Sequence, residues 1–198
     1  KRMGIKSKLD ENASIALGTS VVSPLELCSA YSTFANNGVH VEPVSILRIE
    51  DKFGQPIVTY KPDRAKAIDP ETNYVMVSML KGVVNGGTGI AVRSRYHFHE
   101  DAGGKTGTTQ DNKDAWFAGF NSKLVAVVWV GFDQPQSLHE YGAQAALPIW
   151  INFMGQVLKN SPIAKLPQPS DIVTVRIDPK TGLLATPSQS NAIFEQFR

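Results

Sequence analysis

Two β-type segments separated by a very short turn constrain the fold of this 198-residue chain most strongly. The segment AWFAGF (115–120) is followed by the turn NSK and then by LVAVVWVGFD (124–133). A turn this short joins neighbouring antiparallel strands, because parallel strands need a long crossover. The second segment is too uniformly apolar for either face to be exposed, so we interpret it as a central strand covered on both faces.

A helix and a hairpin are expected upstream of this pair. Ser23 is a good N-cap, Glu26 completes a capping box with it, and Gly38 can end the helix in a left-handed conformation. Two β-rich runs (41–51 and 56–62) then flank a glycine-containing turn, which is typical of a β-hairpin.

Two further helices are expected. Asp69 is the expected cap of one that ends at Gly86-Gly87, and a third runs from Ala143 to an Asn-Ser-Pro stop at 160–162. The expected apolar stripe of the second helix has three members: Val75, Met79 and Val83. The order of elements predicts an α+β fold in which an antiparallel sheet is flanked by helices on both faces.

Composition narrows the function classes. With 42% hydrophobic and 19% charged residues the chain can bury a core, and a net charge of +2 without a basic run does not favour nucleic-acid binding. No apolar run is long enough to span a bilayer, and the single cysteine, Cys28, is expected to be a small buried hydrophobe. LPQPSD (166–171) is a linker by composition, so we divide the chain into a domain at 1–165 and a linker with a C-terminal extension at 166–198, which holds one strand and a turn.

The stretch GGKTGTTQDNKD before the strand pair contains Gly-Lys-Thr, which also ends a phosphate-binding loop. That loop requires a glycine five positions before Gly104, where this chain has His99. It also requires a buried strand before it and a helix after it, and neither flank fits. The sequence therefore argues against a nucleotide site.

An extended segment with an accessible edge is the better interpretation of the same residues. Side chains alternate along a strand, so Thr106 and Thr108 share one face while Lys105 and Gly107 lie on the other. Two hydroxyls, a nearby ammonium and an open strand backbone suit an extended peptide that ends in a carboxylate. Glycine at position 107 permits close approach to the backbone.

KTG is also the third motif of penicillin-binding proteins and β-lactamases, and its surroundings strengthen that match. KTGTTQDNKDAWFAGF, LGTSVVSPLELCSAYSTFANNGV, LKGVVNGGTGIA and IDPKTGLLA resemble class A (bifunctional) penicillin-binding proteins, most closely the 1A type, over nearly the whole chain. The resemblance implies the C-terminal half of a serine D,D-transpeptidase domain with a five-stranded antiparallel sheet. It implies no cofactor or metal, and as partners D-Ala-D-Ala stem peptides of peptidoglycan and β-lactam antibiotics, which acylate the same serine.

Site residues follow from the resemblance by position. The substrate-binding residues that it implies are Lys105, Thr106, Gly107, Thr108, Thr109 and Tyr141. The resemblance also implies catalytic roles for Lys105 and Thr108: the ammonium would supply positive charge near the serines of the other motifs, and the Thr108 N–H would complete the oxyanion hole. The hydroxyls of Thr106 and Thr108 would bind the substrate carboxylate, and Tyr141, in the loop LHEYGA, is expected at the rim of the cleft.

Two motifs of such an enzyme are missing. The sole S-x-x-K match is Ser78 to Lys81, which we interpret as an ordinary helical pair too close to Lys105, and no S-x-N occurs. We therefore expect the nucleophile, its lysine and S-x-N on upstream residues not in this chain. A membrane anchor and a glycosyltransferase module are expected there too, with the domain outside the cytoplasm. This chain alone is predicted to be inactive.

Other interpretations stay open. A D,D-carboxypeptidase, a β-lactamase or a non-catalytic peptide-binding module could use the same strand edge. Asp114 is expected to be a turn carboxylate, and Trp116 and Phe117 core aromatics. His97 and His99 would share one face of an extended segment, but no third ligand has clear spacing, so we expect a surface loop there.

Overall fold

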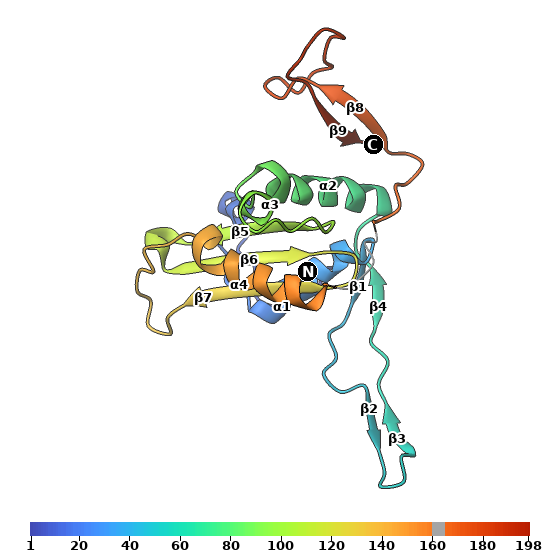
Figure 1. Ribbon diagram of the computed structural model, residues 1–198. Helices are drawn as coiled ribbons and strands as arrows, with labels where there is room; N and C mark the ends of the chain where they lie inside the picture. The colour runs from blue at the N-terminus through green and yellow to red at the C-terminus, as the bar shows by residue number, and fades with distance from the viewer. Residues whose placement is uncertain (160–164) are drawn as a thin grey trace.

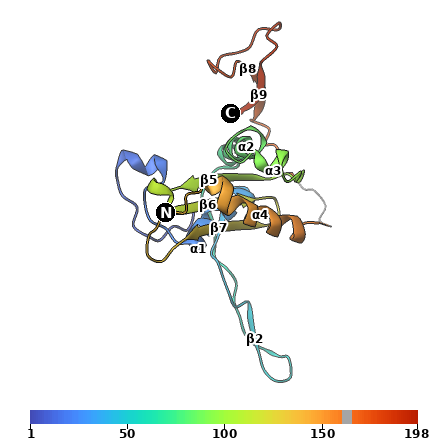
Figure 2. The same cartoon turned by 60° about the vertical axis from the view of Figure 1, so that its left-hand side comes forward.

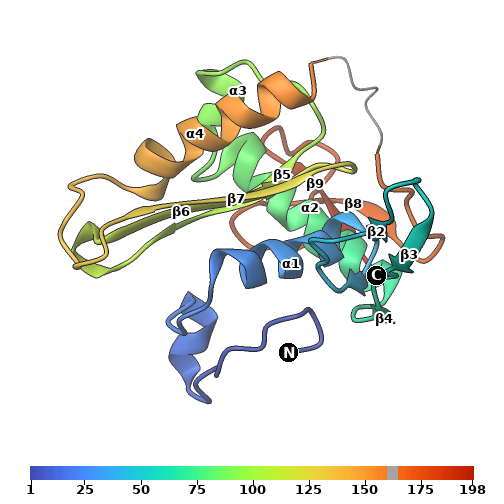
Figure 3. The same ribbon diagram turned by 90° about the horizontal axis from the view of Figure 1, so that it is seen from below.

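The computed structural model describes residues 1–159 and 165–198 and has an α+β fold (Figure 1). A three-stranded antiparallel sheet has the order β5–β6–β7, with β5 at Gly103–Thr108, β6 at Asp114–Phe120 and β7 at Val125–Gly131. Helix α1 (Pro24–Ala35) covers one face of the sheet and helix α4 (Gly142–Val157) the other (Figure 3). The predicted antiparallel sheet with helices on both faces is confirmed. The described residues contribute three of the five strands that the resemblance implies for a whole domain.

The prediction for the second apolar strand is confirmed for its two covered faces, while the described residues pair it along one edge only. β6 and β7 do pair antiparallel in register, from Asp114 opposite Gly131 to Phe120 opposite Val125. However, β6 is the central strand and β7 lies at an edge of this sheet, although α1 and α4 contact it from both sides. A uniformly apolar run reports that both faces are covered, and says nothing about whether both edges are paired.

The predicted capping box of α1 is present and reaches further than expected. Ser23 Oγ accepts from the N–H of Glu26 at 3.2 Å, and Glu26 Oε2 accepts from the N–H of Ser23 at 3.0 Å. The same carboxylate accepts from the N–H groups of Lys6 and Ser7 and from the Ser7 hydroxyl. These bonds, the one from the Ser23 backbone above all, hold the pKa of Glu26 well below that of an ordinary carboxyl. Glu26 thus fixes the N-terminal segment to the start of α1.

Helix α2 (Pro70–Gly86) ends where predicted but differs in two details. Asp69 precedes it without a side-chain cap, since its carboxylate pairs with Lys66 at 2.7 Å. The predicted stripe was also wrong: Met79 is exposed, and the buried residues are Asn73, Val77, Leu80 and Val84. Apolar residues occur around most of this helix, so their spacing alone did not fix which stripe faces the sheet.

Two apolar clusters hold the layers together. Between the sheet and α4, Phe117 packs against Trp150, with ring centroids 4.9 Å apart, and both side chains are fully buried. On the opposite face Phe120 packs with Tyr31 and Phe34 of α1. Burial there raises the pKa of Tyr31 to about 12. Side chains on the two faces of β6 therefore contribute to both clusters, Phe117 to one and Phe120 to the other.

Two β-hairpins project from the sheet-and-helix body (Figures 1 and 2). The predicted hairpin is confirmed as β2 (Arg48–Glu50) and β3 (Pro56–Thr59), and at its base, nearer the body, β1 (Val39–Val41) pairs with β4 (Arg64–Lys66) (Figure 1). The C-terminal extension holds two strands where one was predicted, β8 (Val173–Ile177) and β9 (Ile193–Phe197).

Short elements complete the chain: η1 (Ala13–Leu17), α3 (Ala91–Ser94) and η2 (Gln110–Asn112). The predicted stop of the third helix at 160–162 lies outside the described residues. No helix in the described ranges is long and apolar enough to cross a membrane.

Candidate active site

Strand β5 is covered along its first half and open along its second. Its first residues, Gly103 and Gly104, are buried, and a Cβ at Gly103 would come within 3.3 Å of Leu80 of α2. Helix α2 ends at Gly86, and from Lys105 onward the strand is exposed or half-buried. The KTG residues therefore occupy the part of the sheet edge that α2 leaves uncovered.

The pairing pattern fixes which backbone groups face this open edge. Thr109 N donates to Asp114 O at 3.1 Å, so the two residues form a hydrogen-bonded pair at the end of the ladder. Backbone groups in an antiparallel ladder alternate, so those of Gly107 point to β6 and those of Thr106 and Thr108 point outward. Lys105 Nζ donates to the carbonyl of Thr106 at 2.8 Å, which agrees with an outward carbonyl. An added strand would meet the outward backbone groups of Thr106 and Thr108 here.

The side chains of β5 alternate as predicted. Thr106 lies opposite Phe117, on the α4 side of the sheet, and Thr108 points the same way. Lys105 and Gly107 lie opposite Ala118 and Trp116, on the α1 side. At the open edge, the two threonine hydroxyls therefore lie on one face of the sheet and the Lys105 ammonium lies on the other.

Both hydroxyls have partners that the sequence analysis missed. The Thr108 hydroxyl oxygen accepts from the N–H of Gly142, the first residue of α4, at 3.0 Å. The Thr106 hydroxyl lies 2.8 Å from that of Thr88, which follows α2. Thr88 lies in the segment LKGVVNGGTGIA, but no sequence signal connects Thr88 or Gly142 to β5.

A cleft of about 470 Å³ lies on the Lys105 face of the strand. One wall is the segment from Ala16 to Val22 with the start of α1, and the other is β5 with the Trp116 side chain. The cleft is lined by Lys105, Thr106, Gly107, Thr108 and Thr109. Five of the six expected substrate-binding residues therefore border one space. The sixth, Tyr141, is largely exposed just before α4 and is not among the lining residues.

The turn after the strand is held by Asp114. Its Oδ2 accepts from the Thr109 hydroxyl at 2.9 Å, its N–H donates back to that hydroxyl at 2.9 Å, and its Oδ1 accepts from Trp129 Nε1 at 2.8 Å. Thr109 therefore has its hydroxyl hydrogen engaged inside the protein, unlike Thr108. Asp114 is the expected turn carboxylate and Phe117 is in the core, whereas Trp116 lines the cleft and packs near Trp129.

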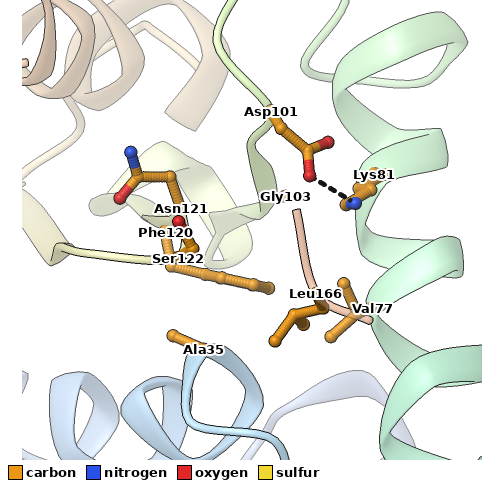
Figure 4. Close-up of a pocket in the computed structure, with 9 residues that line it drawn as sticks. All are labelled: Ala35, Val77, Lys81, Asp101, Gly103, Phe120, Asn121, Ser122 and Leu166. Carbon is orange, nitrogen blue, oxygen red and sulfur yellow. Dashed lines mark hydrogen bonds and ion pairs between the residues drawn. The ribbon is translucent and has the colours of Figure 1, made fainter. Parts of the chain in front are cut away.

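The S-x-x-K match has a structural explanation. Lys81 Nζ pairs with Asp101 Oδ2 at 2.7 Å, and both side chains are about three-quarters buried (Figure 4). Figure 4 shows this pair beside a small hollow lined by Val77, Phe120 and Leu166. No residue that lines this hollow also lines the cleft. The ammonium of Lys81 is thus committed to Asp101, as expected for an ordinary helical lysine.

The histidine segment is part of the link between α3 and β5. Phe98 is buried in the core while His99 beside it is exposed. Within residues 1–159 and 165–198, no group of three or more His, Cys, Asp or Glu side chains is placed to hold a metal ion.

Comparisons with known proteins bear on the family and the fold of the chain. The family model described as "Penicillin binding protein transpeptidase domain" matches residues 2–155. Penicillin-binding protein 1A of Pseudomonas aeruginosa is 39% identical over 98% of this chain and 30% of its own length. The crystal structure of penicillin-binding protein 1A from Haemophilus influenzae matches with a TM-score of 0.87 and 30% identity, over 99% of this chain and 35% of that one. PonA1 from Mycobacterium tuberculosis, solved with penicillin V, shares the fold at a TM-score of 0.69 and 24% identity, over 86% of this chain and 51% of that one. The chain spans between 22% and 30% of the length of the curated 1A relatives that it matches.

Proposed function

The chain belongs to the penicillin-binding protein transpeptidase family, and on that premise we propose that it supplies the substrate-binding strand of a serine D,D-transpeptidase. Such an enzyme cross-links peptidoglycan stem peptides through an acyl-enzyme and is acylated by β-lactams. The observation that carries the proposal is the open half of β5, where outward backbone groups, two hydroxyls and an ammonium meet at one edge. A peptide added to this edge gains main-chain hydrogen bonds and a carboxylate site together.

The roles of the threonines follow from their bonds. Because the Thr108 oxygen accepts from a backbone N–H, its hydrogen is available to donate to a carboxylate, which can only accept. The outward N–H of Thr108 is suited to stabilise the oxyanion of a tetrahedral intermediate. A donor of this kind typically lowers the barrier by about 2.7–4 kcal/mol.

Lys105 contributes charge on the other face of the strand. Its ammonium lines the cleft and is exposed, so a neighbouring serine or a substrate carboxylate could reach it. A fixed positive charge at this point favours both the anionic substrate and the negative charge that develops on acylation. Lysine at 105 is therefore assigned a catalytic and a substrate-binding role.

The attacking serine is assigned to residues outside this sequence. Ser78 is rejected because its lysine is held by Asp101 and neither residue borders the cleft. An S-x-x-K serine with an S-x-N element, supplied by an upstream part of the same polypeptide, would complete the site. That part would also anchor the protein outside the cytoplasm. Within this chain, 1–165 belongs to the catalytic domain and 166–198 forms a linker and C-terminal extension.

Labelling with a fluorescent penicillin tests the proposal. The complete protein that contains this chain should be labelled, and the 198-residue chain alone should not. Ser78→Ala should leave the labelling of the complete protein unchanged, while Lys105→Ala should slow it strongly. If the isolated chain became labelled and Ser78→Ala removed the label, the assignment of the nucleophile would be wrong.

A non-catalytic peptide-binding module is the second candidate, because the same open edge could bind a peptide without any nucleophile. It is distinguished by the same experiment. A complete protein that binds penicillin reversibly, without a covalent adduct in denaturing gels or in intact mass, would favour it.

A further inference from the structure

The turn that follows α2 holds Thr88 in a fixed position beside the site. Gly87 N and Gly89 N both donate to Val83 O, at 3.2 and 3.0 Å. A Cβ at Gly87 would lie 2.9 Å from Val83 Cα, and one at Gly89 would lie 3.2 Å from Val83 O, so both glycines pack closely on the helix end. Thr88 therefore extends from a tightly constrained backbone toward β5.

The contact that it makes is with Thr106. The two hydroxyl oxygens lie 2.8 Å apart, which is an ordinary O–H···O separation, and either can be the donor. A hydroxyl has one hydrogen and can accept two hydrogen bonds. If Thr106 donates to Thr88, the Thr106 hydroxyl hydrogen is used in this contact and cannot bind a ligand. If Thr88 donates to Thr106, the Thr106 hydrogen is left for a ligand.

A carboxylate distinguishes between these two arrangements. It can only accept, so it binds Thr106 only when Thr88 is the donor. The neighbouring Thr108 is already arranged in that way, since the Gly142 N–H that it accepts from can only donate. When Thr88 is the donor, both threonines accept from a group behind them, and both hydroxyl hydrogens are left for one anionic ligand.

We propose that Thr88 is a positioning residue that directs the Thr106 hydroxyl toward the carboxylate of the bound peptide or β-lactam. The inference rests on the proposed function and extends it, because it adds to the KTG strand a residue from the end of α2. Thr88 acts through Thr106, so its effect should appear only for ligands that carry the carboxylate. Removing its hydroxyl should cost roughly 3- to 10-fold in affinity, the scale of one net hydrogen bond.

Acylation kinetics in the complete protein test this proposal. The rate of acylation is followed over a range of concentrations for benzylpenicillin and for its methyl ester, which lacks the free carboxylate. Thr88→Val, which keeps the shape and removes the hydroxyl, should raise the half-saturating concentration of benzylpenicillin roughly 3- to 10-fold, with little change in the limiting rate. The ester should react equally with Thr88→Val and with the unsubstituted protein, and Thr88→Ser should restore benzylpenicillin binding.

Coupling to Thr106 provides a second readout. In a double-mutant cycle, Thr88→Val should have little further effect on benzylpenicillin once Thr106 is already valine. Equal losses for acid and ester, failure of Thr88→Ser to restore binding, or additive effects of the two substitutions would each show a merely structural role and overturn the inference. If neither ligand acylates the unsubstituted protein, the proposed function itself fails, which is a different result from a Thr88 effect that is absent.

Discussion

Gly142 offers the sharpest test of how α4 supports the site. A Cβ added there would lie 2.4 Å from Gly107 O and 2.5 Å from Trp116 O, well inside van der Waals contact. Both atoms belong to the backbone of the paired strands β5 and β6, so neither can move like the end of a flexible side chain. The substitution Gly142→Ala must therefore shift the start of α4 away from the KTG strand and lengthen the bond from Gly142 N to Thr108 Oγ1.

Two opposing effects determine how much Gly142→Ala changes the free energy of unfolding. Alanine is preferred over glycine in a helix by about 0.5–1 kcal/mol, which alone would stabilise the variant. Overpacking typically costs about 1–3 kcal/mol, and a lost hydrogen bond about 0.5–1.5 kcal/mol more. We expect a net loss of about 2 kcal/mol in the free energy of unfolding, equivalent to a decrease in Tm of about 4–8 °C for a domain of this size.

Thermal unfolding monitored by tryptophan fluorescence measures this change. Gly155→Ala is the matched control, because it lies in the same helix, is exposed, and has no heavy atom within 4 Å of the added Cβ. The control should be neutral or slightly more stable. If Gly142→Ala behaved like Gly155→Ala, the close approach of α4 to the strand pair would be refuted.

Two further predictions concern the core and the N-terminal segment. Phe117→Ala removes a fully buried ring from beside Trp150 and should lower the free energy of unfolding in urea by about 3–5 kcal/mol; a loss below about 1 kcal/mol would contradict the packing. The lowered pKa of Glu26 stabilises the fold at neutral pH, and this contribution is lost as the pH falls from 4.5 toward the lower pKa of the folded state. Glu26→Gln should therefore be less stable than the parent at pH 7, and the difference should shrink in acid; a difference that does not change with pH would refute the role of the charge.

The predictions from sequence were correct for features that depend only on residues close together in the chain. The capping box at Ser23 and Glu26 and the tight turn between β6 and β7 were correct, because each depends on residues a few positions apart. The alternation of Lys105 and Thr106 across β5 was correct for the same reason. The six site residues came from the KTG motif and its resemblance, and five of them border one cleft.

The remaining features depend on contacts between distant segments. Which stripe of α2 is buried depends on how the helix lies against β5, and spacing could not decide it. The partners of the two threonine hydroxyls, Thr88 and Gly142, lie 18 and 34 positions away from them in the chain, so no local pattern connects them. The order of the strands β5, β6 and β7 in the sheet is not reported by hydrophobicity either.

The central claim is that the edge from Lys105 to Thr108 binds the substrate while the nucleophile lies elsewhere. Mapping the acylated residue measures this most directly: the complete protein is incubated with a penicillin, digested, and the modified peptide is sequenced by mass spectrometry. We predict a single adduct on a serine outside the 198 residues, with a rate that falls strongly in Lys105→Ala. An adduct on Ser78, or on any other residue of this chain, would contradict the account.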